Sequence, residues 1–247
     1  MLTVFLTAIG VGGATVVGAL LGFIFKKATH RFSDIVLGFS AGVMLCAAVI
    51  GLILPSVELG GKFGVLYAIS GIIVGALVIN LVDKFLPHTH KLNTETEQNG
   101  KHVSKVLLFV LAIAIHNFPE GIAAGVGFGT GNNSHAIMIA VGIALQNIPE
   151  GIVIIAPMLA VGFSKKKTFF IALLTGLIEV VGTVIGYFAV KISTAILPFV
   201  LAFAGGTMLY VISNDMIPET HAHGAYKGAT YALLIGFCLM LLLDFLL

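Results

Sequence analysis

The sequence predicts an all-α polytopic membrane protein with eight transmembrane helices. Hydrophobic residues make up 58% of the 247 residues, charged residues only 10%, and the mean hydropathy is +1.10. A soluble domain is about half apolar and roughly a quarter charged. Apolar runs long enough to cross a bilayer recur along the whole chain. Little sequence remains for anything else, so residues 1–247 are predicted to form a single transmembrane domain.

The eight predicted spans are, in chain order, 3–25, 34–54, 64–86, 105–129, 134–161, 168–190, 195–219 and 226–247. Eleven of the 13 Lys and Arg residues fall in the loops after the first, third, fifth and seventh spans or at the span ends that border these loops. Because positively charged loops stay in the cytoplasm, both termini are predicted to lie outside, in a plasma-membrane protein. The first span is not expected to be a signal peptide, because no basic residue precedes it and Lys26 and Lys27 follow it. No basic patch suggests nucleic acid, so the lipid bilayer is the expected surrounding.

The second and seventh spans carry an internal repeat. FSAGVML at 39–45 resembles FAGGTML at 203–209, and the two spans run in opposite directions. This pattern predicts inverted repeats in a 3+2+3 arrangement, with three helices on each side of a central pair. Glycines spaced four apart, such as Gly71 with Gly75 in the third span, predict close helix packing and permit a homodimer without requiring one.

The longest loop, 87–104, follows the third span and carries three histidines. It is polar and is predicted to be mobile and cytoplasmic. His88, His90 and His102 could bind metal there, or they could simply belong to a polar loop.

The fourth and fifth spans contain near-copies of one polar motif, HNFPEG at 116–121 and QNIPEG at 146–151. His116 lies 11 residues after Lys105, which is about 16 Å of helix, or half of a roughly 30 Å hydrocarbon core. Each ionisable group at that depth costs about 2.5–3.5 kcal/mol on insertion scales. Such a cost predicts a functional cation site at the membrane midplane.

The spacing within the motifs places ligands together. His116 and Glu120 are four residues apart on one helical face, and Gln146 and Glu150 repeat this on the neighbouring helix. Pro119 and Pro149 each remove a helical N–H and free a carbonyl beside the same space. Imidazole with carboxylates suits Zn²⁺, Fe²⁺ and Mn²⁺, and the absence of thiolates argues against a closed structural zinc site.

The sixth and seventh spans add polar residues. Glu179 lies in the middle of the sixth span, at the same predicted depth as the paired motifs. The inner end of the seventh span carries a further polar cluster, which is either an exit-side relay or a solvated helix end. Its members are Asp215, Glu219, His221 and His223.

The paired motifs and the eight-span plan resemble the Zrt/Irt-like (ZIP) divalent metal transporters, especially their bacterial branch. The resemblance implies import of Zn²⁺, and often of Fe²⁺, Mn²⁺ or Cd²⁺, into the cytoplasm through a two-metal midplane site. It assigns His116, Glu120, Gln146 and Glu150 to one metal position. It assigns Asn117, Asn147 and Glu179 to the second, with Glu120 and Glu150 bridging.

This chain departs from the family pattern in both motifs. Gln146 stands where many members have His, and Asn147 where some have Asp. Each change removes a strong ligand or a charge, which puts the second position in question.

The expected function is therefore transport by alternating exposure of the midplane site, with metal as cargo and no prosthetic group. A cation exporter remains the nearest alternative, because sequence sets topology but not transport direction. An intramembrane metal-dependent hydrolase would need three strong ligands, an open water position and a general base. The chain has no HExxH motif, so an enzyme is not expected.

Overall fold

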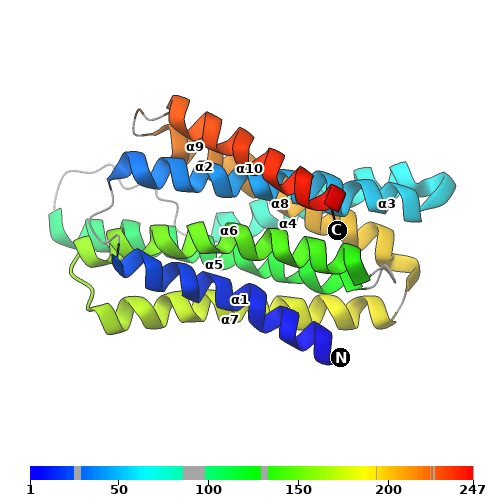
Figure 1. Cartoon of the computed structure of the whole chain (residues 1–247), viewed down its shortest axis with the longest axis horizontal. Helices are drawn as coiled ribbons and strands as arrows, with labels where there is room; N and C mark the ends of the chain where they lie inside the picture. Colours follow the sequence, from blue (N-terminus) through cyan, green and yellow to red (C-terminus); the bar gives the residue numbers. More distant parts are fainter. Residues whose placement is uncertain are drawn as a thin grey trace.

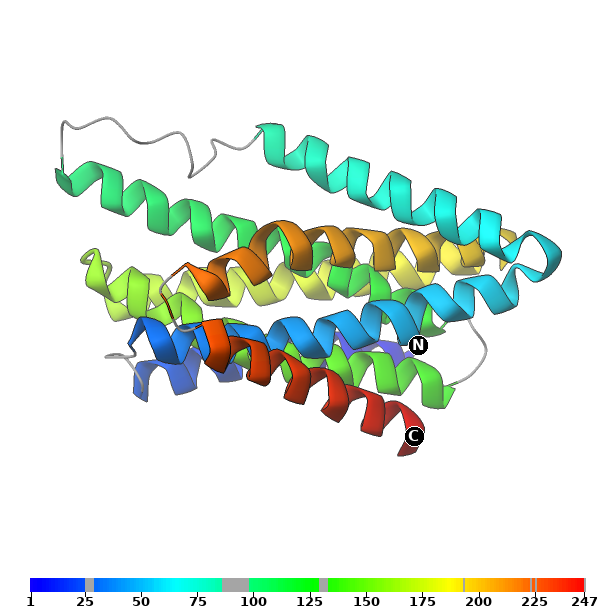
Figure 2. The same cartoon turned by 90° about the horizontal axis from the view of Figure 1, so that it is seen from above.

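The computed structural model describes residues 1–24, 29–85, 98–128, 133–192, 194–222, 224 and 226–246, and these residues contain helices and no strand. Seven helical stretches within them are long and apolar enough to cross a membrane, which confirms the all-α polytopic prediction. The helices run roughly along the long axis of the molecule, and the two chain ends lie at the same end of it (Figures 1 and 2).

The helices largely follow the predicted spans. Their bounds are α1 Leu2–Ile24, α2 His30–Cys46, α3 Leu54–Leu59, α4 Gly64–Phe85, α5 Gln98–Gly127, α6 Asn133–Ala160, α7 Lys165–Ile192, α8 Leu197–Val211, α9 Ile217–His221 and α10 Tyr226–Leu246. The predicted loop 87–104 falls mostly outside the described residues, and from Gln98 onward it is helical. His88, His90 and the side chain of His102 lie outside the described part of the structure.

Two of the predicted spans contain a π-helical segment. Ala47–Ile53 joins α2 to α3, and Ile212–Met216 joins α8 to α9. In each case a proline opens the following helix, Pro55 in α3 and Pro218 in α9. Because a proline nitrogen has no hydrogen to donate, the hydrogen-bond register shifts ahead of it. The two segments follow FSAGVML and FAGGTML, so the repeat extends beyond the residues that first indicated it.

The helices pack into two bundles, and glycines lie at the close contacts between the helices of each bundle. The first bundle consists of α1, α5, α6 and α7. A methyl group on Gly18 of α1 would meet the backbone of Ile148 in α6, and one on Gly125 of α5 would meet the backbone of Thr183 in α7. These helices therefore touch backbone to backbone, as small-residue contacts between membrane helices do.

The second bundle consists of α2 with α3, α4, α8 with α9, and α10. Gly42 of α2 lies against the backbone of Leu233 in α10, and Gly75 of α4 against that of Phe203 in α8. Numbering the spans 1 to 8, the tight pairs are 1 with 5 and 4 with 6 in the first bundle, and 2 with 8 and 3 with 7 in the second. In a pair of inverted repeats, span 1 corresponds to span 6, span 2 to span 7, span 3 to span 8 and span 4 to span 5. Under this correspondence, each tight pair maps onto the other tight pair of the same bundle.

Side chains fill the space between the bundles. Gly142 of α6 faces the side chain of Met240 in α10, and Gly51 faces the side chain of Ile139. The main buried cluster, which includes Met44 and Met208, extends across this boundary. In Figure 1, α5 and α6 lie between the α2–α10 pair and the α1–α7 pair, so the two helices with the repeated motif are central.

The outward faces of several helices are apolar. Exposed side chains on α1, α4 and α10 include Phe5, Leu20, Leu66, Ile73 and Leu234. Exposure of large apolar residues along whole helices is what contact with lipid requires.

Candidate metal centre

The repeated motifs lie near the middle of two continuous central helices. Pro119 is inside α5 and Pro149 is inside α6, and neither helix ends there. His116 and Gln146 each lie one turn before the glutamate of their own motif. Glu179 is in the middle of α7, which packs against α5 through Gly121 and Gly182.

All seven residues predicted to bind metal are buried. Relative exposure is 7% for His116, 4% for Glu150, and 0% for Asn117, Glu120, Gln146, Asn147 and Glu179. Three carboxyl groups and an imidazole are therefore held away from solvent. Burial of this kind is costly unless the groups are hydrogen-bonded, paired or coordinated.

Several of these buried atoms have no hydrogen-bond partner among the described residues. They include both carboxyl oxygens of Glu120, the amide oxygen and nitrogen of Gln146, and the side-chain oxygens of Asn117 and Asn147. Native proteins rarely leave buried polar atoms unsatisfied. Five of these atoms are oxygens, the atoms that can donate lone pairs to a cation.

Asn147 and Glu179 form the tightest polar contact of the centre. The Asn147 side-chain nitrogen lies 2.7 Å from each carboxyl oxygen of Glu179. The same nitrogen lies 3.1 Å from the carbonyl oxygen of Val11. These contacts join α6, α7 and α1 inside the first bundle. Asn117 points its nitrogen at another helix in a similar way, 3.3 Å from the carbonyl oxygen of Thr175.

Ser40 contacts the centre from the second bundle. Its hydroxyl donates to Glu150 Oε1 at 2.9 Å and lies 3.1 Å from the Gln146 carbonyl oxygen. Sequence reasoning missed this residue. The only signal was the repeat itself, because Ser40 stands where the second copy has Ala204.

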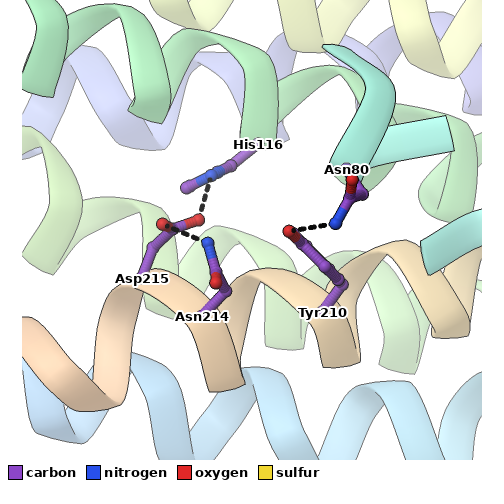
Figure 3. A network of polar contacts seen from close by, with 5 residues as sticks. All are labelled: Asn80, His116, Tyr210, Asn214 and Asp215. Atoms are coloured by element: carbon purple, nitrogen blue, oxygen red, sulfur yellow. Dashed lines mark hydrogen bonds and ion pairs between the residues drawn. The ribbon is translucent and has the colours of Figure 1, made fainter. Parts of the chain in front are cut away.

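Asp215 also contacts the centre from the second bundle. Its Oδ2 lies 3.2 Å from Nε2 of His116, without the geometry of a hydrogen bond. Its Oδ1 accepts a hydrogen bond from the side chain of Asn214 at 3.0 Å (Figure 3). The nearby bond between Asn80 and Tyr210, 3.0 Å long, joins α4 to α8 within the second bundle.

The rest of the predicted exit-side cluster is not joined to the centre in the same way. His221 lies 2.8 Å from the carbonyl oxygen of Ile217 in its own helix and beside Thr220. Glu219 is exposed. His223 lies outside the described residues.

The centre depends on amides as well as on ionisable groups. Within the described part of the chain, no three His, Cys, Asp or Glu side chains gather closely enough to hold a metal ion by themselves. Cys46 and Cys238 are free thiols outside the motifs. Any ion at this centre would therefore be held by a mixture of carboxylate, imidazole and amide ligands, a set without thiolate.

Comparison with known proteins gives a consistent picture. The family model described as ZIP Zinc transporter matches residues 88–244. The chain is 39% identical to the zinc transporter GufA of Myxococcus xanthus over 239 residues, covering 94% of each chain. It is 38% identical to the zinc transporter ZupT of Chlorobaculum parvum over 246 residues, which are 93% of this chain and 91% of that protein. It is 32% identical to the human zinc transporter ZIP11 over 319 aligned positions, covering 94% of this chain and 93% of the relative.

Proposed function

We propose, because this chain belongs to the ZIP zinc transporter family, that it carries Zn²⁺ into the cytoplasm through the centre between α5 and α6. Membership of the family makes the chain a membrane transporter of divalent metal and not an enzyme. Its relatives named above are zinc transporters, which supports zinc as the cargo. Fe²⁺, Mn²⁺ and Cd²⁺ are further candidates, since they accept the same ligands.

The observation that carries the proposal is the set of buried oxygen atoms without partners. Glu120 contributes two of them and Gln146 one, and both side chains are fully buried. A cation at this point would satisfy these atoms and offset the cost of burying the carboxylates. His116, Glu120, Gln146 and Glu150 are the ligands we propose. Amide and carboxylate ligands without thiolate hold an ion weakly enough to release it, as a transport pathway requires.

The division into two bundles supports alternating access. Glycine contacts fix the helices of each bundle backbone to backbone, whereas side chains fill the boundary between the bundles. We propose that one bundle moves against the other as a rigid body, so that the centre faces each side of the membrane in turn. The ligands lie on α5 and α6, in the first bundle, so the ion would travel with that bundle.

The placement of basic residues supports the proposed topology. Lys165, Lys166 and Lys167 lie at the start of α7, and both chain ends lie at the opposite end of the molecule (Figures 1 and 2). Under the positive-inside rule the end with the three lysines faces the cytoplasm of a plasma membrane, with both termini outside. Release near Asp215, toward that end, would then be release into the cell.

The test is metal flux into liposomes that contain the purified protein, comparing Zn²⁺, Cd²⁺, Fe²⁺ and Mn²⁺. Glu120→Ala and Glu150→Ala should each abolish saturable flux, whereas Asp244→Ala near the end of α10 serves as a matched carboxylate control. Flux that survives both substitutions in the centre would show that the paired motifs are not the pathway.

A further inference from the structure

We infer that the midplane centre of this chain holds one divalent ion and not two, because the side-chain amide of Asn147 donates hydrogen bonds to the carboxylate of Glu179. This inference rests on the proposed function and specifies how many ions the same centre carries. It differs from the two-metal site that the resemblance implied, in which Asn117, Asn147 and Glu179 would hold the second ion.

The orientation of the Asn147 amide is fixed by its surroundings. Three oxygen acceptors surround its nitrogen, two from Glu179 at 2.7 Å and one from Val11 at 3.1 Å. An amide nitrogen donates hydrogen bonds and has no lone pair to offer a cation, so it must be the nitrogen that faces these acceptors. A cation bound to Glu179 would have to displace this donor and turn the amide around.

The proposed ligands differ in whether the protein already satisfies them. Both oxygens of Glu179 accept hydrogen bonds from Asn147, whereas among the described residues no group lies in hydrogen-bond geometry to either oxygen of Glu120. Gln146 is fully buried, and within the described part of the chain neither of its side-chain polar atoms has a partner in hydrogen-bond geometry. The first metal position thus contains polar atoms that a cation would satisfy. In the second position, the Asn147 amide already donates hydrogen bonds to the Glu179 carboxylate.

Charge balance leads to the same stoichiometry. One divalent ion neutralises the carboxylates of Glu120 and Glu150, and the amide of Asn147 stabilises the remaining carboxylate of Glu179. Two divalent ions would place four positive charges against these three carboxylates in a buried environment, where unbalanced charge is costly. Replacing Asn147 by aspartate would supply the fourth negative charge and remove the competing donor. Asn147→Asp should therefore convert a one-ion centre into a two-ion centre.

The experiment measures how many Cd²⁺ ions the purified full-length protein binds at saturation, by equilibrium dialysis and elemental analysis. The Glu120→Ala/Glu150→Ala double variant supplies the background from all other sites, and the difference counts the ions of the centre. We expect a difference of one for the natural chain, two for Asn147→Asp, and one again for Asn147→Asp combined with Glu179→Gln.

The outcomes separate this inference from the function on which it rests. A difference of two in the natural chain would overturn the one-ion centre and leave the transport proposal standing. A folded Asn147→Asp protein that still binds one ion would also overturn it. A difference of zero in the natural chain would instead remove the proposed metal centre itself. If Asn147→Asp fails to fold, the natural chain alone decides between one ion and two.

Discussion

Among the described residues, Ser40 is the hydroxyl that bonds to a candidate ligand from the opposite bundle. It donates to Glu150 at 2.9 Å, and both side chains are buried. A hydrogen bond to a charged group contributes about 1.5–3 kcal/mol, and about 1.4 kcal/mol corresponds to a factor of ten in affinity. Under the proposed function we therefore expect Ser40 to act through Glu150, by holding one of its carboxyl oxygens in place.

Ser40→Ala should raise the KM for metal by about tenfold or more while lowering kcat less, and Ser40→Thr should restore the KM because it keeps the hydroxyl. Flux into liposomes at graded metal concentrations measures both constants. Ser56→Ala is the matched control, since Ser56 is also buried and bonds to the carbonyl oxygen of Pro198 at 2.6 Å, within the second bundle. An unchanged KM in Ser40→Ala would refute this role.

Within the predicted exit-side cluster, Asp215 should affect transport more than Glu219. Asp215 lies 3.2 Å from His116, whereas Glu219 is exposed. If the ion leaves past Asp215, Asp215→Asn should lower kcat several-fold with little change in KM, because the substitution keeps the shape and removes the charge. Glu219→Gln should lower kcat less. Equal effects of the two substitutions on kcat would mean that the contact between Asp215 and His116 plays no part in release.

The pairing of the candidate ligands along each helix could be predicted from sequence, whereas their hydrogen-bond partners could not. Residues four apart on a helix share a face whatever the tertiary structure, so His116 with Glu120 and Gln146 with Glu150 could be read from spacing. Ser40 lies 110 residues from Glu150, and 32 residues separate Asn147 from Glu179. Such contacts depend on how helices pack, and no local pattern specifies them.

At the scale of the helix, glycines determine which neighbours can touch. Gly18 of α1 lies against the backbone of Ile148 in α6, within the second motif, whereas a methyl group on Gly10 of the same helix would meet no atom of the described residues within 4 Å. Gly18→Ala must push the helices apart, because a backbone contact cannot rotate away as a side chain can. Overpacking of this kind costs about 1–3 kcal/mol.

Gly18→Ala should therefore lower the midpoint of thermal unfolding by several degrees in detergent, while Gly10→Ala should leave it nearly unchanged. Size-exclusion chromatography after heating gives the midpoint from the fraction that remains folded. Similar midpoints for the two variants would contradict the glycine-closed contact between α1 and α6.

The π-helical segments show what helix prediction from sequence leaves out. Apolar length and flanking charge predicted the spans, because a bilayer imposes both on any helix that crosses it. A shift from α to π register changes neither length nor hydropathy. Pro55 and Pro218 were visible, but each is also compatible with a simple kink.

At the scale of the whole molecule, the boundary between the bundles is where movement is expected, and it can be tested by cross-linking. A Cβ on Gly142 of α6 would lie 4.0 Å from the Cβ of Ala47 in the second bundle. A Cβ on Gly127 of α5 would lie 3.7 Å from that of Ala136 in α6, within the first bundle. Both separations suit a disulfide, whose Cβ atoms are about 3.5–4.5 Å apart.

In a protein freed of its own thiols by Cys46→Ala and Cys238→Ala, oxidation of the Ala47→Cys/Gly142→Cys pair should stop metal flux, and reduction should restore it. Oxidation of the Gly127→Cys/Ala136→Cys pair should leave flux largely intact, because those two helices are expected to move together. Full flux through a protein cross-linked between the bundles would refute rigid-body movement at this boundary. Loss of flux from both cross-links would mean that α5 and α6 must also separate, so that the moving unit is smaller than the first bundle.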